Sequence, residues 1–253
     1  MSRLFRAVTG AALALALAAC GGSAMPAATN PAEPVTLMVL AAASLTDAFT
    51  DLTEQYEAEH ERVTIELSFG SSTTLAQQIA EGVEADLFAS AGRGALDHLL
   101  ENYAAEGGET IIATNVLEIT VAPGNPLGIT GLQDFTRTDI DTVLCAETVP
   151  CGRAADEAFA AQGIIAQPVS REIDVRATLA KIALDEADAA IVYRSDVATE
   201  PGVDGVQIPA DQNVPLDYPL VWFNTGEHTV GFAEFIAGSS GKEALTNAGF
   251  SVP

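Results

Sequence analysis

The chain has 253 residues, 48% of them hydrophobic, and carries a formal net charge of −24 from 35 acidic and 11 basic residues. This length and apolar content suffice for one large or two modest domains with a buried core. The acidity excludes nucleic-acid binding, because the phosphate backbone requires a basic face. It also means that any site for an anion must work through short-range donors and not through the overall field.

The N-terminus has the layout of a secretory signal. Two arginines precede an apolar stretch from Ala7 to Ala19, which is shorter than the roughly 20 residues of a membrane-spanning helix. The run Leu-Ala-Ala ending at Cys20 resembles the bacterial lipobox, in which the cysteine is lipidated; the alternative is an ordinary cleavage site with an incidental cysteine. We therefore predict a signal peptide over 1–19 and a lipidated, Gly/Ala/Pro-rich tether over 20–34.

Two further cysteines, Cys145 and Cys151, flank a short loop that contains Pro150. In an exported protein they can form a disulfide or remain as two partly buried thiols, and sequence alone leaves both alternatives open. The three histidines are scattered, and none lies near a cysteine at the spacing of metal ligands. No metal-ion site and no cofactor are predicted.

The first half of the chain reads as alternating strands and helices. Val35–Leu40 is a nearly continuous apolar run, as in a strand that is buried on both faces. Ser44 then opens a helix, and with Asp47 it fits the Ser-x-x-Asp form of a capping box. A strand over 63–69, a helix from Leu75 to near residue 82 and a strand over 85–89 follow. This succession predicts a parallel sheet covered by helices.

The second half repeats the alternation. The expected strands are 115–123, 143–144, 189–193 and 218–223, and the expected helices are 152–161, 174–184, 230–237 and 244–249. We predict two α/β lobes, the first over 35–113 and 224–253 and the second over 114–223, with the strand over 218–223 returning toward the first. Ligands of such folds lie at the carboxyl ends of strands and between domains.

Two of the predicted strands end in small residues and a serine, Ser44 in the first case and Ser72 in the second. A serine at a helix start offers its hydroxyl beside the unpaired N–H groups of the first turn, where the helix dipole favours an anion. Two such starts that face each other can surround a small oxyanion.

Six blocks of the sequence, taken in order, resemble the ModA-type molybdate-binding proteins, the extracytoplasmic receptors of molybdate ABC importers. The blocks are Ala41–Thr46, Ser71–Ala76, Ala85–Phe88, Val149–Gly152, Asp174–Arg176 and Ile191–Tyr193. The resemblance covers the chain after the tether. It implies a two-lobed type II periplasmic-binding-protein fold of the α/β class, with mostly parallel sheets and a ligand cleft between the lobes.

The resemblance also implies a set of oxyanion ligands. Ser44 and Ser72 would each give a hydroxyl and an N–H, Cys151 and Val175 would each give a backbone N–H, and Tyr193 would give its phenol. Many relatives carry a smaller residue at the position of Cys151; since only the backbone is used there, binding should survive. Two arginines in these motifs, at positions 153 and 176, are expected to be solvated helix charges and not anion clamps.

These ligands are all neutral donors, which suits a fully deprotonated dianion such as molybdate. Tungstate has nearly the same size and charge, and a receptor for sulfate or another tetrahedral oxyanion is the alternative. Phosphate keeps a proton near neutral pH and would gain from a carboxylate. An enzyme is not expected, because there is no Gly-x-Ser-x-Gly motif and no histidine in the cleft motifs.

The expected protein is thus a monomeric receptor anchored by lipid to the membrane, on the periplasmic side or the outer face. Its expected partner is an ABC permease with a cytoplasmic ATPase.

Overall fold

A computed structural model describes residues 33–253. The predicted signal peptide, the lipidation at Cys20 and the tether up to residue 32 lie outside the described residues. Within the described part, no helix has the length and apolar character that crossing a membrane requires.

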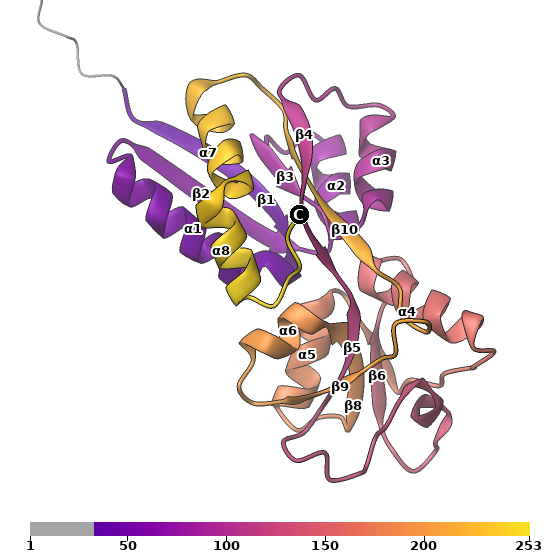
Figure 1. Ribbon diagram of the computed structural model, residues 1–253. Helices are drawn as coiled ribbons and strands as arrows, with labels where there is room; N and C mark the ends of the chain where they lie inside the picture. Colours follow the sequence, from indigo (N-terminus) through magenta and orange to yellow (C-terminus); the bar gives the residue numbers. More distant parts are fainter. Residues whose placement is uncertain (1–32) are drawn as a thin grey trace, which may run out of the picture. The chain divides into compact units, whose positions relative to one another are not determined.

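Five strands form the first sheet (Figure 1). In spatial order they are β2 (Val63–Gly70), β1 (Val35–Ala42), β3 (Leu87–Ala89), β10 (Leu216–Trp222) and β4 (Gly108–Asn115). β1 runs parallel to β2 and β3, whereas β10 runs antiparallel to β3 and β4.

The second sheet also has five strands. They are, in spatial order, β7 (Ser170–Glu172), β6 (Thr142–Cys145), β8 (Ala189–Tyr193), β5 (Leu117–Val121) and β9 (Asp204–Gln207). β6 is parallel to β7 and β8, and β5 is antiparallel to β8 and β9. The predicted α/β class with mostly parallel sheets is confirmed. In each sheet four strands run in one direction, and a single antiparallel strand, β10 in the first sheet and β5 in the second, pairs on both its sides.

Helices pack on both sheets. Those in contact with the first sheet are α1 (Thr46–Glu59), α2 (Ser72–Ala80), α3 (Arg93–Leu100), α7 (Glu227–Ala237) and α8 (Ser239–Asn247). Those in contact with the second sheet are α4 (Pro150–Ala161), α5 (Val175–Ala183) and α6 (Arg194–Thr199). Two short 3₁₀ helices complete the set, η1 (Ala43–Leu45) and η2 (Leu132–Thr136).

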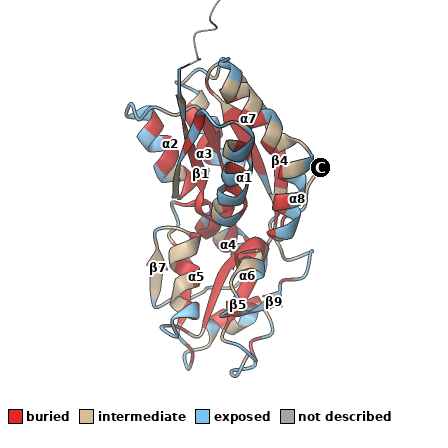
Figure 2. Ribbon diagram, turned by 90° about the vertical axis from the view of Figure 1, so that its left-hand side faces the viewer, coloured by how far each residue is buried: buried red, intermediate tan, exposed pale blue. Residues whose placement is uncertain are grey.

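The alternation of side chains along β1 explains why nearly all of its residues are apolar. Successive side chains of a strand point to opposite faces, and neighbouring residues of β1 accordingly enter different clusters. Val39 packs with the cluster that includes Phe49 of α1 and Phe232 of α7, whereas Leu40 packs with Leu75 of α2. Figure 2 shows the resulting buried strands between partly exposed helices.

The chain passes between the sheets where β4 leads into β5 and again between β9 and β10. The second passage corrects the predicted limit of the second lobe. Leu216–Trp222 pairs with β3 and β4, so the chain has returned to the first sheet before residue 216 and not after residue 223. An apolar run predicts a strand, but the sheet that the strand joins depends on which edge is free for pairing.

Candidate anion-binding site

A pocket lies where several helices begin. Its lining residues are Ala42, Ala43, Ser44, Gly70, Ser71, Ser72, Ala91, Pro150, Cys151, Asp174, Val175 and Tyr193. All five residues that the resemblance implies as ligands are among them. Ser44 and Ser72 belong to the part of the chain that forms the first sheet, and the other three belong to the part that forms the second sheet. The cavity volume is about 10 Å³, enough for little more than one water-sized sphere. This is far less than the few hundred Å³ typical of sites for organic ligands, and it favours a small ion.

Ser44 lies in the 3₁₀ turn between β1 and α1 and is 4% exposed. The predicted capping box is wrong: α1 begins at Thr46, and its N-cap, Leu45, makes no side-chain cap bond. The Ser44 hydroxyl is instead 2.9 Å from the hydroxyl of Tyr218 on β10. When Tyr218 donates, the proton of Ser44 remains available to a ligand in the pocket.

Ser72 is the first residue of α2, and the cap of this helix is its neighbour Ser71. Ser71 accepts a hydrogen bond from Thr74 N–H at 3.1 Å, which leaves Ser72 free of the capping role. The Ser72 hydroxyl accepts from Ala91 N–H at 2.9 Å. Since a hydroxyl has a single proton, and the bond from Ala91 uses a lone pair, Ser72 still has that proton to donate.

Backbone donors come from two helix starts. Cys151 is the second residue of α4, and Val175 is the first residue of α5. The first N–H groups of a helix have no carbonyl partner within the helix, and the dipole makes this end electropositive. Asp174 caps α5 by accepting from Ala177 N–H at 2.8 Å, so the carboxylate in the pocket wall is already committed to the helix.

Tyr193 ends β8 and is the N-cap of α6. Its side chain is 1% exposed, and its hydroxyl has no hydrogen-bond partner among the described residues. Burial, reinforced by Tyr218 and Asp196, raises the pKa of Tyr193 well above the usual value of a phenol. The group therefore keeps its proton and acts as a donor at neutral pH. A buried, unpaired donor in a pocket wall points to a ligand that accepts.

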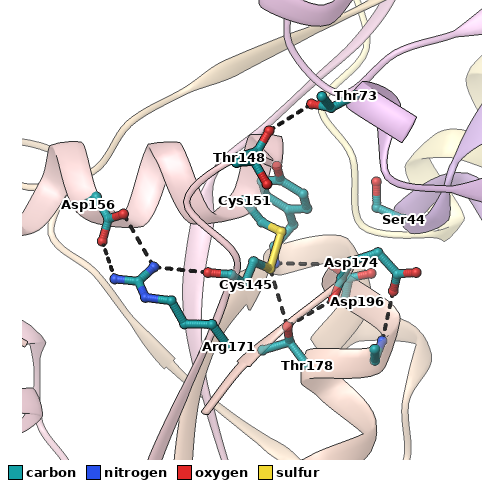
Figure 3. The surroundings of a disulfide bond; sticks show 12 residues. Ser44, Thr73, Cys145, Thr148, Cys151, Asp156, Arg171, Asp174, Thr178 and Asp196 are labelled. Atoms are coloured by element: carbon teal, nitrogen blue, oxygen red, sulfur yellow. Dashed lines mark hydrogen bonds and ion pairs between the residues drawn. A yellow bond between two sulfur atoms is a disulfide. The ribbon is translucent and has the colours of Figure 1, made fainter. Parts of the chain in front are cut away.

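A disulfide joins Cys145 at the end of β6 to Cys151 in α4, so the alternative of two free thiols is wrong (Figure 3). The enclosed loop is held further by Arg171, whose guanidinium donates to the Cys145 carbonyl at 3.0 Å and pairs with Asp156 at 2.9 Å. Position 152 requires glycine, because the loop backbone passes very close to it. A Cβ atom at this position would lie 2.0 Å from the Ala146 carbonyl oxygen. This packing sets the direction in which the N-terminus of α4 points.

Of the two arginines near the pocket, Arg153 is exposed, as expected of a solvated helix charge, whereas Arg176 is partly buried and paired with carboxylates. Arg176 makes ion pairs with Asp47 and Asp196, and its side chain is 27% exposed. Arg153 donates to the Thr148 carbonyl. Neither arginine is among the pocket-lining residues, so the donors around the pocket are neutral.

Sequence reasoning missed Tyr218 and Asp196. Tyr218 is fully buried and orients Ser44, and Asp196 accepts from Tyr193 N–H at 3.0 Å. An acid three residues after Tyr193 is a cap signal that the sequence does contain. Nothing local marks Tyr218, because the contact to Ser44 joins residues 174 positions apart.

Residues 37–251 match the family described as bacterial extracellular solute-binding protein, and the chain belongs to this family. The molybdate-binding protein ModA of Mycobacterium tuberculosis H37Rv is 36% identical over 253 residues, which cover 96% of this chain and 95% of the relative. The predicted membership in the ModA-type proteins is thereby confirmed.

Two solved structures share the fold. The periplasmic molybdate-binding protein of Azotobacter vinelandii has a TM-score of 0.75 at 18% identity, covering 86% of this chain and 99% of that one. The sulfate-binding protein SubI of M. tuberculosis has a TM-score of 0.71 at 18% identity, covering 85% and 86%. The predicted periplasmic-binding-protein fold is confirmed.

Proposed function

We propose that this protein binds molybdate or tungstate in the pocket through seven neutral donors and delivers the anion to an ABC permease. The hydroxyls and N–H groups of Ser44 and Ser72, the N–H groups of Cys151 and Val175, and the Tyr193 phenol form the proposed shell. The single observation that carries the proposal is the buried Tyr193 hydroxyl, which has no partner among the described residues and lines a pocket surrounded by helix N-termini.

The donor set supports tight binding of a dianion. A charge-assisted hydrogen bond contributes about 1.5–3 kcal/mol, and desolvation and closure oppose the sum. A net of roughly 10–12 kcal/mol corresponds to a dissociation constant in the nanomolar range. The relatives' identity as molybdate-binding proteins supports molybdate as the anion, and the receptor role supports binding without catalysis.

Sulfate is the second candidate, because the sulfate-binding SubI has the same fold. Sulfate and molybdate are both tetrahedral dianions at neutral pH and differ mainly in size. A shell of fixed donors discriminates by size, since donors placed for the larger anion lie too far from the oxygens of the smaller one.

The family membership supports an extracytoplasmic receptor with a membrane permease as partner. Anchoring through a lipid on Cys20, a monomeric state and a cytoplasmic ATPase in the importer complete the proposal. These follow from the lipobox-like N-terminus and from the ModA resemblance.

Calorimetric titration of the purified protein with molybdate, tungstate, sulfate and phosphate tests the proposal. One-to-one binding of molybdate and tungstate in the nanomolar range, with sulfate at least 100-fold weaker, is expected at about 0.15 M salt. Tight sulfate binding would keep the anion site and overturn the named substrate. No binding of any of the four anions would overturn the function.

A further inference from the structure

Arg176 occupies an unusual place for a basic residue. It is the second residue of α5, directly after the proposed ligand Val175. A cation is unfavourable at a helix N-terminus, because the dipole is positive there. Its position is therefore not explained by the stability of α5, and the contacts of its guanidinium supply the reason.

One side of the guanidinium faces Asp196. The distance from Arg176 Nε to Asp196 Oδ1 is 3.5 Å, and Asp196 is fully buried. The other carboxylate oxygen, Oδ2, accepts from Tyr193 N–H at 3.0 Å. Arg176 thus holds the carboxylate that in turn fixes the backbone of Tyr193.

The other side faces α1. The terminal Nη2 of Arg176 forms an ion pair with Asp47, whose side chain is 48% exposed. Asp47 lies in the first turn of α1, three residues after Ser44. α1 packs on the first sheet and α5 on the second, so this ion pair joins the two halves of the chain beside the pocket.

One arginine consequently connects the segments that carry three proposed ligands, Ser44, Val175 and Tyr193. Hydrogen bonds also join the halves, among them the Thr73 hydroxyl to the Thr148 carbonyl at 2.9 Å and the Arg194 guanidinium to the Gly249 carbonyl at 3.1 Å, but neither is an ion pair. Since Asp47 lies three residues after Ser44, any movement that brings Asp47 to Arg176 would also carry Ser44 toward Val175 and Tyr193.

We propose that Arg176 is a positioning residue for anion binding: it is anchored on Asp196 and clasps Asp47 when the two halves close on the ligand. The inference rests on the proposed function. This ion pair between Arg176 and Asp47, which we call the clasp, slows the release of the anion, because it must break before Ser44 can move away from the ligand. Asp196 is the fixed partner and Asp47 the exchangeable one, in keeping with their burial.

The test compares Asp47→Asn with Asp51→Asn, a matched control one turn further along α1, where Asp51 accepts a hydrogen bond from the exposed Gln55. Both variants remove one negative charge, which by itself strengthens the binding of an anion slightly. Molybdate affinity is measured by calorimetry, the dissociation rate by stopped flow, and the melting temperature without ligand by calorimetric scan. Asp47→Glu, which keeps the carboxylate, is the conservative rescue.

We expect Asp47→Asn to bind molybdate about 5- to 20-fold more weakly, chiefly through faster dissociation. Asp51→Asn should match or slightly exceed the wild type, Asp47→Glu should recover most of the affinity, and the melting temperature of the ligand-free protein should not change. In an Arg176→Met background, Asp47→Asn should have no further effect on affinity.

Three outcomes would overturn the clasp. Equal affinity of Asp47→Asn and Asp51→Asn would show that the ion pair does not act on binding. Tighter binding by Asp47→Asn would show that Arg176 only screens a repulsive carboxylate. A loss of ligand-free stability that accounts for the whole loss of affinity would assign Asp47 a purely structural role. If the wild type itself binds none of the four anions, the proposed function fails and not the clasp alone.

Discussion

The buried hydroxyl of Tyr193 lowers the stability of the ligand-free protein and is proposed to bind the ligand. A buried donor without a partner costs about 1–3 kcal/mol, and this residue lies in the pocket wall with no partner among the described residues. Such a cost is commonly tolerated at functional sites, where a ligand supplies the missing acceptor.

We predict that Tyr193→Phe weakens molybdate binding about 10- to 100-fold, the equivalent of one charge-assisted bond of about 1.5–3 kcal/mol. The same variant should raise the free energy of unfolding of the ligand-free protein by about 1 kcal/mol, because it removes an unsatisfied group. Calorimetry and denaturant unfolding measure the two effects. Unchanged affinity would remove Tyr193 from the shell.

Asp196 predicts a dependence of stability on pH. Burial raises the pKa of Asp196 from 3.8 to about 7, with Arg176 and the Tyr193 N–H opposing and Asp47 and Asp174 adding to the rise. A carboxyl whose pKa is higher in the folded state binds its proton more readily there. Proton binding at Asp196 therefore adds to the free energy of unfolding. This contribution is complete below pH 4 and is lost as the pH rises through about 7.

We expect the unfolding free energy of the wild type, measured against that of Asp196→Asn, to fall by at most about 4 kcal/mol between pH 4 and pH 8. Denaturant titrations at a series of pH values give this difference directly. Carboxylates whose pKa values are lowered, such as Asp134, change the stability of the wild type and of the variant equally with pH, so their effect drops out of the difference. A difference that does not vary with pH would show that Asp196 is ionised throughout.

At the scale of elements, the pocket is made by helix starts. α2, α4 and α5 each begin in its wall, and Tyr193 caps α6. Their dipoles and free N–H groups concentrate partial positive charge in the pocket without any lysine or arginine in its lining. The direction in which these N–H groups point depends on how firmly each helix N-terminus is held in place.

The disulfide holds the start of α4. We predict that the double variant Cys145→Ala/Cys151→Ala loses about 2 kcal/mol of unfolding free energy, as for a short closed loop. Its molybdate affinity should fall several-fold, because the Cys151 N–H is less well aimed. Reduced wild-type protein should behave in the same way, which makes reduction the control for the substitutions. Unchanged affinity in both would show that packing around Gly152 alone orients the helix.

At the scale of the whole molecule, the charge opposes the ligand. The formal net charge of −24 repels a dianion at long range, while the pocket attracts it only at contact. Salt screens the repulsion, with a Debye length of about 30 Å at 0.01 M and about 8 Å at 0.15 M.

We therefore expect the association rate of molybdate to rise several-fold between about 0.01 M and 0.15 M salt. The dissociation rate should change less, because the bound anion is enclosed. Stopped-flow measurements of both rates at constant pH, with sodium chloride added to vary the ionic strength, test this prediction. An association rate that falls with salt would show that a local positive field at the mouth dominates over the net charge.

Much of the candidate site was predictable because its residues lie in short sequence motifs. Two strands that end in small residues and a serine mark the helix starts at Ser44 and Ser72, and the ModA resemblance adds three further positions. All five line one pocket. The details that failed are those for which local signals compete. Ser44 was expected to cap a helix, but its hydroxyl contacts Tyr218. Arg176 was expected to be solvated, but two carboxylates from other helices reach it.

The sequence by itself determined the α/β class and the order of most elements, because periodicity and helix-start chemistry act over a few residues. Its resemblance to the ModA-type proteins pointed to the residues that line the pocket. Only the tertiary structure decided that β10 joins the first sheet, that Cys145 and Cys151 are bonded, and that Tyr218 orients Ser44. It alone placed Arg176 between Asp47 and Asp196. These contacts join distant positions, and their formation depends on how the helices and sheets pack and not on the residues next to them in the chain.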